Sequence, residues 1–175
     1  MPSGTAARVA LSTALLVAAI GAQFAVLAPL RLPAATPDLV LLVALALALA
    51  YGPTAGVVIG FSAGLALDLA PPADHPVGQW AMVLCLVGYL AGLAREDAAQ
   101  SVIVAIGAVA FCAAAANVLY AGVGALLGDP RVTWSGLAGA LPAAVLYDVL
   151  LTPFVVPGIG ALTRGRDPTP APWRP

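Results

Sequence analysis

The sequence predicts an all-α integral membrane protein with six transmembrane helices, and three observations support this. First, 62% of its 175 residues are hydrophobic and only 9% are charged, with a mean hydropathy of +1.02. A soluble domain carries about 25% charged residues, so this chain has too few polar groups to cover a water-facing surface. Second, its apolar residues fall into separate runs. Third, its arginines are distributed unevenly between the two ends of these runs.

The apolar runs are about as long as membrane-spanning helices, which need roughly 20 residues with a range of about 17–25. The second run follows Pro37 and stops at Gly52-Pro53, a strong helix break, so it forms a hairpin with the third. It is shorter than a usual span, and the alternative is that it merges with its neighbour or re-enters the membrane. The predicted spans are 9–28, 38–51, 54–70, 77–94, 102–127 and 134–162.

The first run resembles the hydrophobic region of a signal peptide, because it follows Arg8. Signal peptides have hydrophobic regions of about 7–15 residues. The run at 9–28 is longer than this, so we expect it to be retained as the first span.

Arginine placement predicts the orientation, because positive residues are enriched on the cytoplasmic side of a membrane. Six spans put both termini on one side, and an odd number would lose the asymmetry. We therefore expect both termini in the cytoplasm, with a transmembrane domain at 1–163. The Pro-rich tail at 164–175 should be disordered or extended. On this topology the cytoplasmic side holds Arg8, Arg95, Arg164, Arg166 and Arg174, and the other side holds Arg31 and Arg131.

A ladder of glycines occupies the third span, in the segment YGPTAGVVIGFSAGLALDLA at 51–70. Gly52, Gly56, Gly60 and Gly64 recur every fourth residue, and the next step is Asp68. Residues four apart share a helix face, and small residues let helix backbones approach closely in a membrane. The ladder therefore predicts a groove for another helix. That helix is either part of this chain or part of a partner subunit.

Two carboxylates lie close to the predicted outer ends of their helices. Asp38 follows Pro37 in a first helical turn, where a carboxylate meets unpaired backbone N–H groups and the positive end of the helix dipole. Asp68 ends the glycine ladder. Both positions are shallow enough for anchors at the membrane surface. They could also form a polar cluster on the outer face with Arg31 and His75.

Deeper in the spans, Asp148 is the most costly polar residue. A charge near the middle of a membrane helix costs at least about 2.5 kcal/mol unless it is paired or hydrated. We expect Asp148 to be protonated, hydrogen-bonded to Asn117 or Tyr120, or open to a cavity. A structural and a functional role both fit. The other deep polar residues are Gln23, Asn117, Tyr120 and Tyr147.

The sequence carries no enzyme signature. It has no HExxH, GxSxG or phosphate-binding loop motif, and no Cys or His spacing typical of a metal site. Cys85 and Cys112 lie in apolar runs, where cysteine behaves as a small buried side chain. We expect a protein that is not an enzyme, holds no cofactor or metal, and binds no nucleic acid.

Several short motifs resemble the rod shape-determining protein MreD family. Pro37-Asp38-Leu39 opens an apolar helix, and the ladder segment reads GFxxGLxxD from Gly60 to Asp68. A helix with Gly88-Tyr89-Leu90 and Gly92 follows, and Leu151-Thr152-Pro153 lies in the last span. The resemblance implies a non-catalytic subunit of the bacterial inner membrane. Its partners would be the bitopic protein MreC and, less directly, the actin-like MreB and peptidoglycan synthases. The residues implied for partner binding or for shaping the bundle are Asp38, Gly56, Gly60, Phe61, Gly64 and Asp68.

The family is also thought to share a six-helix fold with substrate-binding components of energy-coupling-factor vitamin transporters, which gives an alternative function. That function predicts a cavity near the outer surface lined by Asp68, Trp80, Asn117 and Tyr120. A vitamin site needs several converging polar groups, and this chain offers few, which favours the scaffold. A membrane enzyme acting on a lipid carrier would need more than Arg31 and His75 to hold a phosphate.

Overall fold

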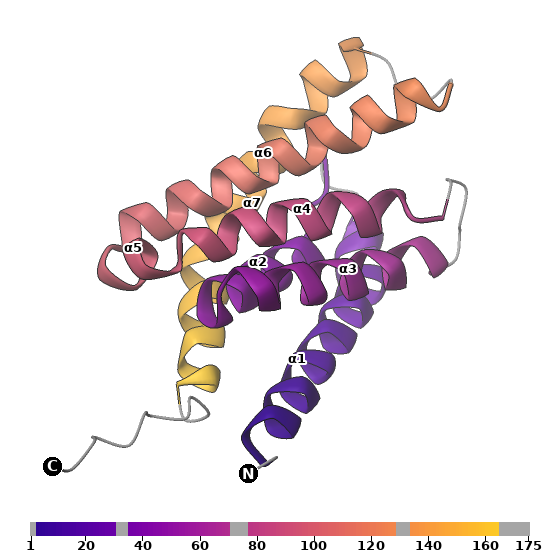
Figure 1. Ribbon diagram of the computed structural model, residues 1–175. Coiled ribbons are helices and arrows are strands. Elements are labelled where there is room, and N and C mark those ends of the chain that lie inside the picture. The colour runs from indigo at the N-terminus through magenta and orange to yellow at the C-terminus, as the bar shows by residue number, and fades with distance from the viewer. Residues whose placement is uncertain (1–2, 31–34, 71–76, 129–133, 165–175) are drawn as a thin grey trace, which may run out of the picture.

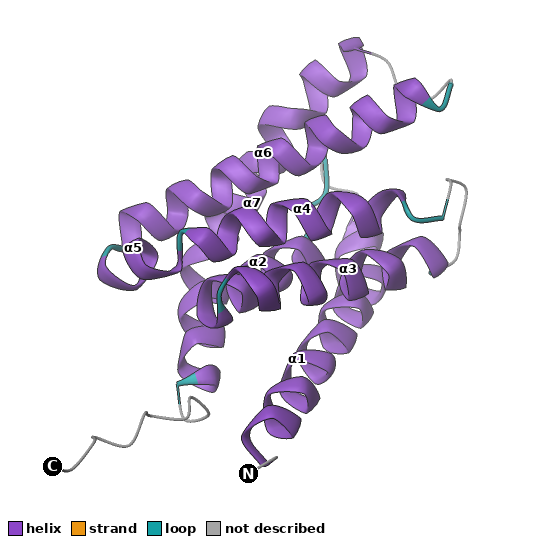
Figure 2. Cartoon of the chain, viewed as in Figure 1, coloured by secondary structure: helices purple, strands orange, loops and turns teal. Residues whose placement is uncertain are grey.

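The computed structural model describes residues 3–30, 35–70, 77–128 and 134–164, and every regular element in these ranges is a helix (Figures 1 and 2). The predicted all-α fold class is therefore confirmed for the described residues. The predicted tail beyond Arg164 lies outside them. The elements are α1 Ser3–Ala22, the π-helical turn η1 Gln23–Leu27, the 3₁₀ turn η2 Ala28–Leu30, α2 Leu39–Tyr51, α3 Pro53–Leu69, α4 Gln79–Leu93, α5 Arg95–Gln100, α6 Val102–Leu126 and α7 Trp134–Thr163.

Three helical segments are long and apolar enough to cross a membrane: Gly4–Leu27, Val102–Leu126 and Ala138–Thr163. The apolar helices α2, α3 and α4 are shorter, at 13, 17 and 15 residues. At 1.5 Å per residue these are roughly 20, 26 and 23 Å long, below the hydrocarbon thickness of about 30 Å. Three of the six predicted spans therefore meet the length of a full crossing, and the protein has the character of a membrane protein.

Helix α2 forms the centre of the bundle. All ten residues from 40 to 49 are buried, and α1, α3, α4 and α7 pack around the helix. A helix that is apolar on every side belongs inside a protein or a membrane. Because other helices surround α2, it does not have to match the bilayer thickness by itself. This explains why the second apolar run is the shortest.

The predicted hairpin between the second and third spans is present. Its turn is the single residue Gly52, with φ of +93°, a conformation that favours glycine. The Gly52 N–H closes α2 by donating to Ala48 O at 2.8 Å. Pro53 then occupies the first turn of α3, where a missing N–H costs nothing.

Helix α5 was not predicted. The residues Arg95-Glu96-Asp97 lie between the fourth and fifth predicted spans, and they form the first turn of a short exposed helix. Glu96 and Asp97 lie near its N-terminus, where acidic residues interact favourably with the helix dipole. The helix packs on α2, α4 and α6.

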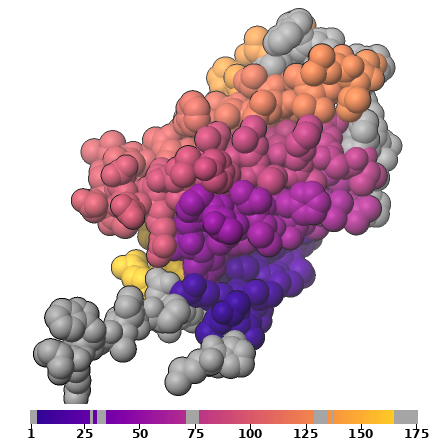
Figure 3. Space-filling model, in the orientation of Figure 1, coloured from indigo at the N-terminus to yellow at the C-terminus, as the bar shows by residue number. Residues whose placement is uncertain are grey.

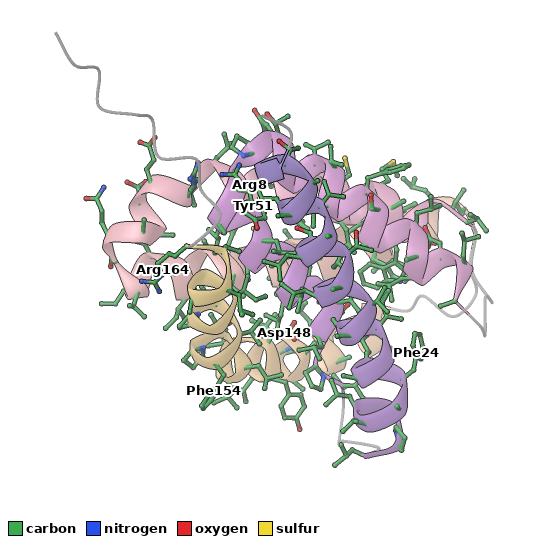
Figure 4. All side chains as sticks on the ribbon, turned by 90° about the horizontal axis from the view of Figure 1, so that it is seen from below. Arg8, Phe24, Tyr51, Asp148, Phe154 and Arg164 are labelled. Atoms are coloured by element: carbon green, nitrogen blue, oxygen red, sulfur yellow. The ribbon has the colours of Figure 1, made fainter. Side chains whose placement is uncertain are left out.

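The arginines of the described residues, Arg8, Arg95 and Arg164, lie at one end of the bundle. The Arg8 guanidinium sits 5.3 Å from the centre of the Tyr51 ring, at the end of α2 (Figure 4). The Arg95 side chain lies beside Gly52, the residue that forms the turn between α2 and α3. Arg164 follows the end of α7, and it lines the same cavity as Arg95. The sequence predicted these three on the cytoplasmic side together with Arg166 and Arg174, which lie outside the described residues, and the orientation stays a prediction.

Candidate functional site

The glycine ladder of α3 lies directly against α4. A Cβ atom added at any of three ladder positions would collide with the backbone of α4, so the two helices can approach this closely only with glycine there. The contacts pair Gly56 with Gly88, Gly60 with Leu84, and Gly64 with Trp80 and Ala81, and Gly92 of α4 meets Pro53 of α3 in the same way. The groove that the ladder predicts is filled by a helix of the same chain.

Of the two roles considered for the ladder, internal packing is the one that these contacts describe. Gly56, Gly60 and Gly64 are all buried. Phe61 lies on another face of α3 and is 50% exposed, together with Val58 at 61%. Figure 3 shows the side chains of α3 and α4 as one continuous surface on the outside of the molecule. Phe61 is thus the large apolar side chain of the GFxxGLxxD motif that faces outward.

Asp68 caps the N-terminus of α4. Its Oδ2 accepts hydrogen bonds from Gly78 N at 2.8 Å and Ala81 N at 3.1 Å, and its Oδ1 accepts one from Trp80 N at 3.1 Å. Gly78 has φ of +100°, so glycine suits this turn. The interpretation of Asp68 as an anchor at the membrane surface is wrong, because the residue is fully buried at 0% exposure. Its carboxylate supplies the acceptors that the first N–H groups of α4 lack.

A second polar junction surrounds the N-terminus of α2. Asp38 is the N-cap residue, and its Oδ1 accepts a hydrogen bond from Leu41 N at 2.9 Å. Gln23, the first residue of η1, accepts one from Val40 N at 3.0 Å through Oε1. The N–H of Asp38 itself donates to Asp148 Oδ1 at 2.9 Å. The N-cap residue, η1 and α7 therefore together supply the acceptors for N–H groups at the start of the buried helix, which have no partner within the helix itself.

Asp148 does not have the partners predicted for it. Its side chain is 1% exposed and points toward α2 from α7 (Figure 4). Asn117 instead donates to Ala113 O of its own helix at 2.9 Å. Tyr120 stacks on Trp80 with 4.4 Å between ring centres, and its carbonyl accepts from Gln79. Position along the apolar runs predicted that these residues are deep, but not which helices meet.

The second oxygen of Asp148 leads to a prediction about stability. Oδ2 is buried and has no hydrogen-bond partner among the described residues. Asp148→Asn keeps one oxygen for the Asp38 N–H and removes a buried carboxyl, so the melting temperature in detergent should stay equal or rise. Asp148→Ala removes the acceptor and should cost about 1–3 kcal/mol of unfolding free energy. Equal losses in the two variants would contradict this role, because they would mean that both oxygens are needed.

The residues predicted to line a vitamin cavity do not line the cavity that the structure places between helices. The Asp68 carboxylate accepts hydrogen bonds from the backbone at the start of α4, and the rings of Trp80 and Tyr120 stack on each other. The cavity, of about 460 Å³, lies at the arginine end between α2, α5, α6 and α7. The predicted outer cluster also included Arg31 and His75, which lie outside the described residues.

Two residues that organise these junctions were not assigned a role from the sequence. Gln23 was noted as a deep polar residue, but the π-helical turn that aims it at α2 has no sequence signal of its own. Gly78 does have a sequence signal, because a glycine directly before an apolar run commonly marks a helix boundary. The described residues contain no group of three or more His, Cys, Asp or Glu side chains that could hold a metal ion.

No family profile, curated protein sequence or solved structure matches this chain.

Proposed function

We propose that this protein is a non-catalytic membrane subunit of the bacterial cell-elongation machinery, of the MreD type. In this role it holds an MreC-like bitopic protein in the plasma membrane. Through that partner it acts on peptidoglycan synthases and, more remotely, on the actin-like MreB. The proposal rests on the sequence motifs, and it is supported by where the structure puts their residues.

The observation that carries the proposal is that the motif residues from Pro37 to Gly92 belong to one packed unit of α2, α3 and α4, and that α7, which carries the Leu151-Thr152-Pro153 motif, packs on α2. Gly60 and Gly64 bring α3 against α4, and Asp68 caps α4. Asp38 caps α2 and is held by Asp148. The carboxylates that a binding site would need accept hydrogen bonds from the protein's own backbone. On α3 itself, the motif side chain Phe61 lies exposed beside Val58, and such an apolar face suits a partner helix better than a polar ligand.

The topology proposed with this function has six membrane-spanning helices and both termini in the cytoplasm. The three shorter helices then lie within a bundle completed by α1, α6 and α7. The grouping of Arg8, Arg95 and Arg164 at one end supports this orientation, because cytoplasmic loops carry an excess of arginine. We also propose that this six-helix fold is like that of the substrate-binding components of vitamin transporters, although the function differs.

The direct test is co-purification of the tagged protein from native membranes in a mild detergent, followed by mass spectrometry. The proposal predicts recovery of a bitopic MreC-like protein and a peptidoglycan synthase. Recovery of an ATPase-containing transporter module would contradict the proposal and favour the vitamin-transport alternative. A tagged, unrelated membrane protein of similar abundance serves as the control for non-specific recovery.

A further inference from the structure

The cavity at the arginine end has the chemistry of a site for an amphiphile. Its volume of about 460 Å³ falls within the roughly 300–1,000 Å³ of typical ligand sites. Apolar side chains from three helices form most of its wall. They include Ala46 and Leu49 of α2, Ile106 of α6 and Val156 of α7. Such a wall excludes water and fits a hydrocarbon chain.

The cavity opens to the outside of the bundle. Val102 of α6 lines it and is 67% exposed, and Pro153 and Pro157 of α7 line it from the other side and are also exposed. Both α6 and α7 contribute segments long enough to cross a membrane. In the proposed topology both helices cross the membrane, so an opening between them faces the bilayer and a lipid chain can enter from the side.

The charged groups of the lining are both positive. Arg95 begins α5, Arg164 follows the end of α7, and both side chains are exposed. Arg164 uses its Nε to donate to Gly160 O at 3.1 Å, which fixes the guanidinium beside the cavity. The carboxylates of α5, Glu96 and Asp97, do not belong to the lining, and among the described residues no acidic side chain does. Figure 4 shows Arg164 at the end of α7, on the side that faces α5.

We propose that this cavity binds a phospholipid with an anionic headgroup, taken from the leaflet at the arginine end. The acyl chain occupies the apolar wall between α2, α6 and α7, and the headgroup phosphate lies between Arg95 and Arg164. Arginine suits this role because its planar guanidinium offers paired donors to a phosphate. Basic pockets between membrane helices on the cytoplasmic side are recurrent sites for anionic headgroups. This site rests on the membrane topology proposed above, but not on the elongation partners.

The test is a lipid titration of the full-length, delipidated protein by native mass spectrometry. Phosphatidylglycerol is compared with phosphatidylcholine of the same acyl chains, so that only the headgroup charge differs. One basic residue near an anionic surface contributes about 1 kcal/mol to lipid binding. Each arginine should therefore increase the affinity for phosphatidylglycerol about fivefold. We expect Arg95→Gln and Arg164→Gln each to weaken phosphatidylglycerol binding by about fivefold, and the double variant to lose the headgroup preference.

Two further variants test the location of the site. Arg8→Gln removes a positive charge at the same end but outside the cavity lining, and should leave the preference intact. Ala99→Leu narrows the cavity at an exposed position of α5 and should weaken the binding of both lipids. Melting temperatures measured without added lipid establish that each variant is folded.

Three results would overturn the proposal. One is a preference for phosphatidylglycerol that survives the double arginine variant. Another is an equal loss in Arg8→Gln, which would indicate diffuse charge attraction. The third is stabilisation by inorganic phosphate that matches stabilisation by phosphatidylglycerol, because it would mean that the arginines bind a free anion and that the apolar wall holds nothing.

Discussion

Replacing Gly60 with alanine is expected to destabilise the protein strongly, although the change adds only one methyl group. The new Cβ would collide with the carbonyl of Leu84, which belongs to the α4 backbone and cannot move aside as a side chain can. The two helices would have to separate along their length. Overpacking a core typically costs about 1–3 kcal/mol, and a collision with backbone should reach or exceed the upper value. The measurement is the melting temperature in detergent, together with the yield of monodisperse protein.

Gly107→Ala is the matched control for this prediction. Gly107 lies in the exposed part of α6, and no atom lies within 4 Å of an added Cβ. Alanine is favoured over glycine in a helix by about 1 kcal/mol, so this variant should be neutral or slightly stabilised. If Gly60→Ala melted at the same temperature as Gly107→Ala, the close approach of α3 and α4 would be disproved.

Removal of the Asp68 carboxylate is expected to have an effect of similar size. Asp68→Ala removes the acceptor of three N–H groups, of which that of Ala81 is buried and those of Gly78 and Trp80 are partly buried. Each unsatisfied buried group costs about 1–3 kcal/mol, and breaking a buried charged network commonly costs about 3–5 kcal/mol. Hydrogen exchange should show the first turn of α4 opening before the rest of the bundle.

Asp68→Asn should be intermediate, because one oxygen remains to accept. Asp97→Asn provides the control, since Asp97 is exposed on α5 and surface substitutions usually change stability by less than about 0.5 kcal/mol. A wild-type melting temperature for Asp68→Ala would show that the cap does not contribute to stability.

Much of the helix layout could be predicted from the sequence, because strong breaks bound most of the apolar runs. The second span was predicted at 38–51 and is Leu39–Tyr51, since Pro37 precedes it and Gly52-Pro53 follows it. The third was predicted at 54–70 and is Pro53–Leu69. The first helix begins earlier than predicted, at Ser3, because polar residues before the apolar run continue the same helix. Helix α5 has too few apolar residues to give a periodic signal.

Beyond the hairpin of α2 and α3, which helices pack against each other could not be predicted from the sequence. A ladder at Gly56, Gly60 and Gly64 shows that some helix packs closely, and Gly88 and Gly92 carry the matching spacing in α4. The junction between Asp38 and Asp148 joins residues 110 positions apart, and no local pattern encodes it. The burial of Asp68 was missed for the same reason, because its partners lie 10 to 13 residues further along the chain.

The proposed role requires that a partner membrane protein docks on the α3 surface around Phe61. It is tested most directly by photo-crosslinking in the native cells, with a photo-reactive phenylalanine placed at position 61 or, as the matched control, at 111. Phe111 is 65% exposed on α6, so both probes are accessible and differ in the helix that carries them. We expect a covalent adduct with a bitopic MreC-like protein from position 61 and none from position 111. The same adducts from both positions, or no MreC-like adduct from position 61, would contradict it.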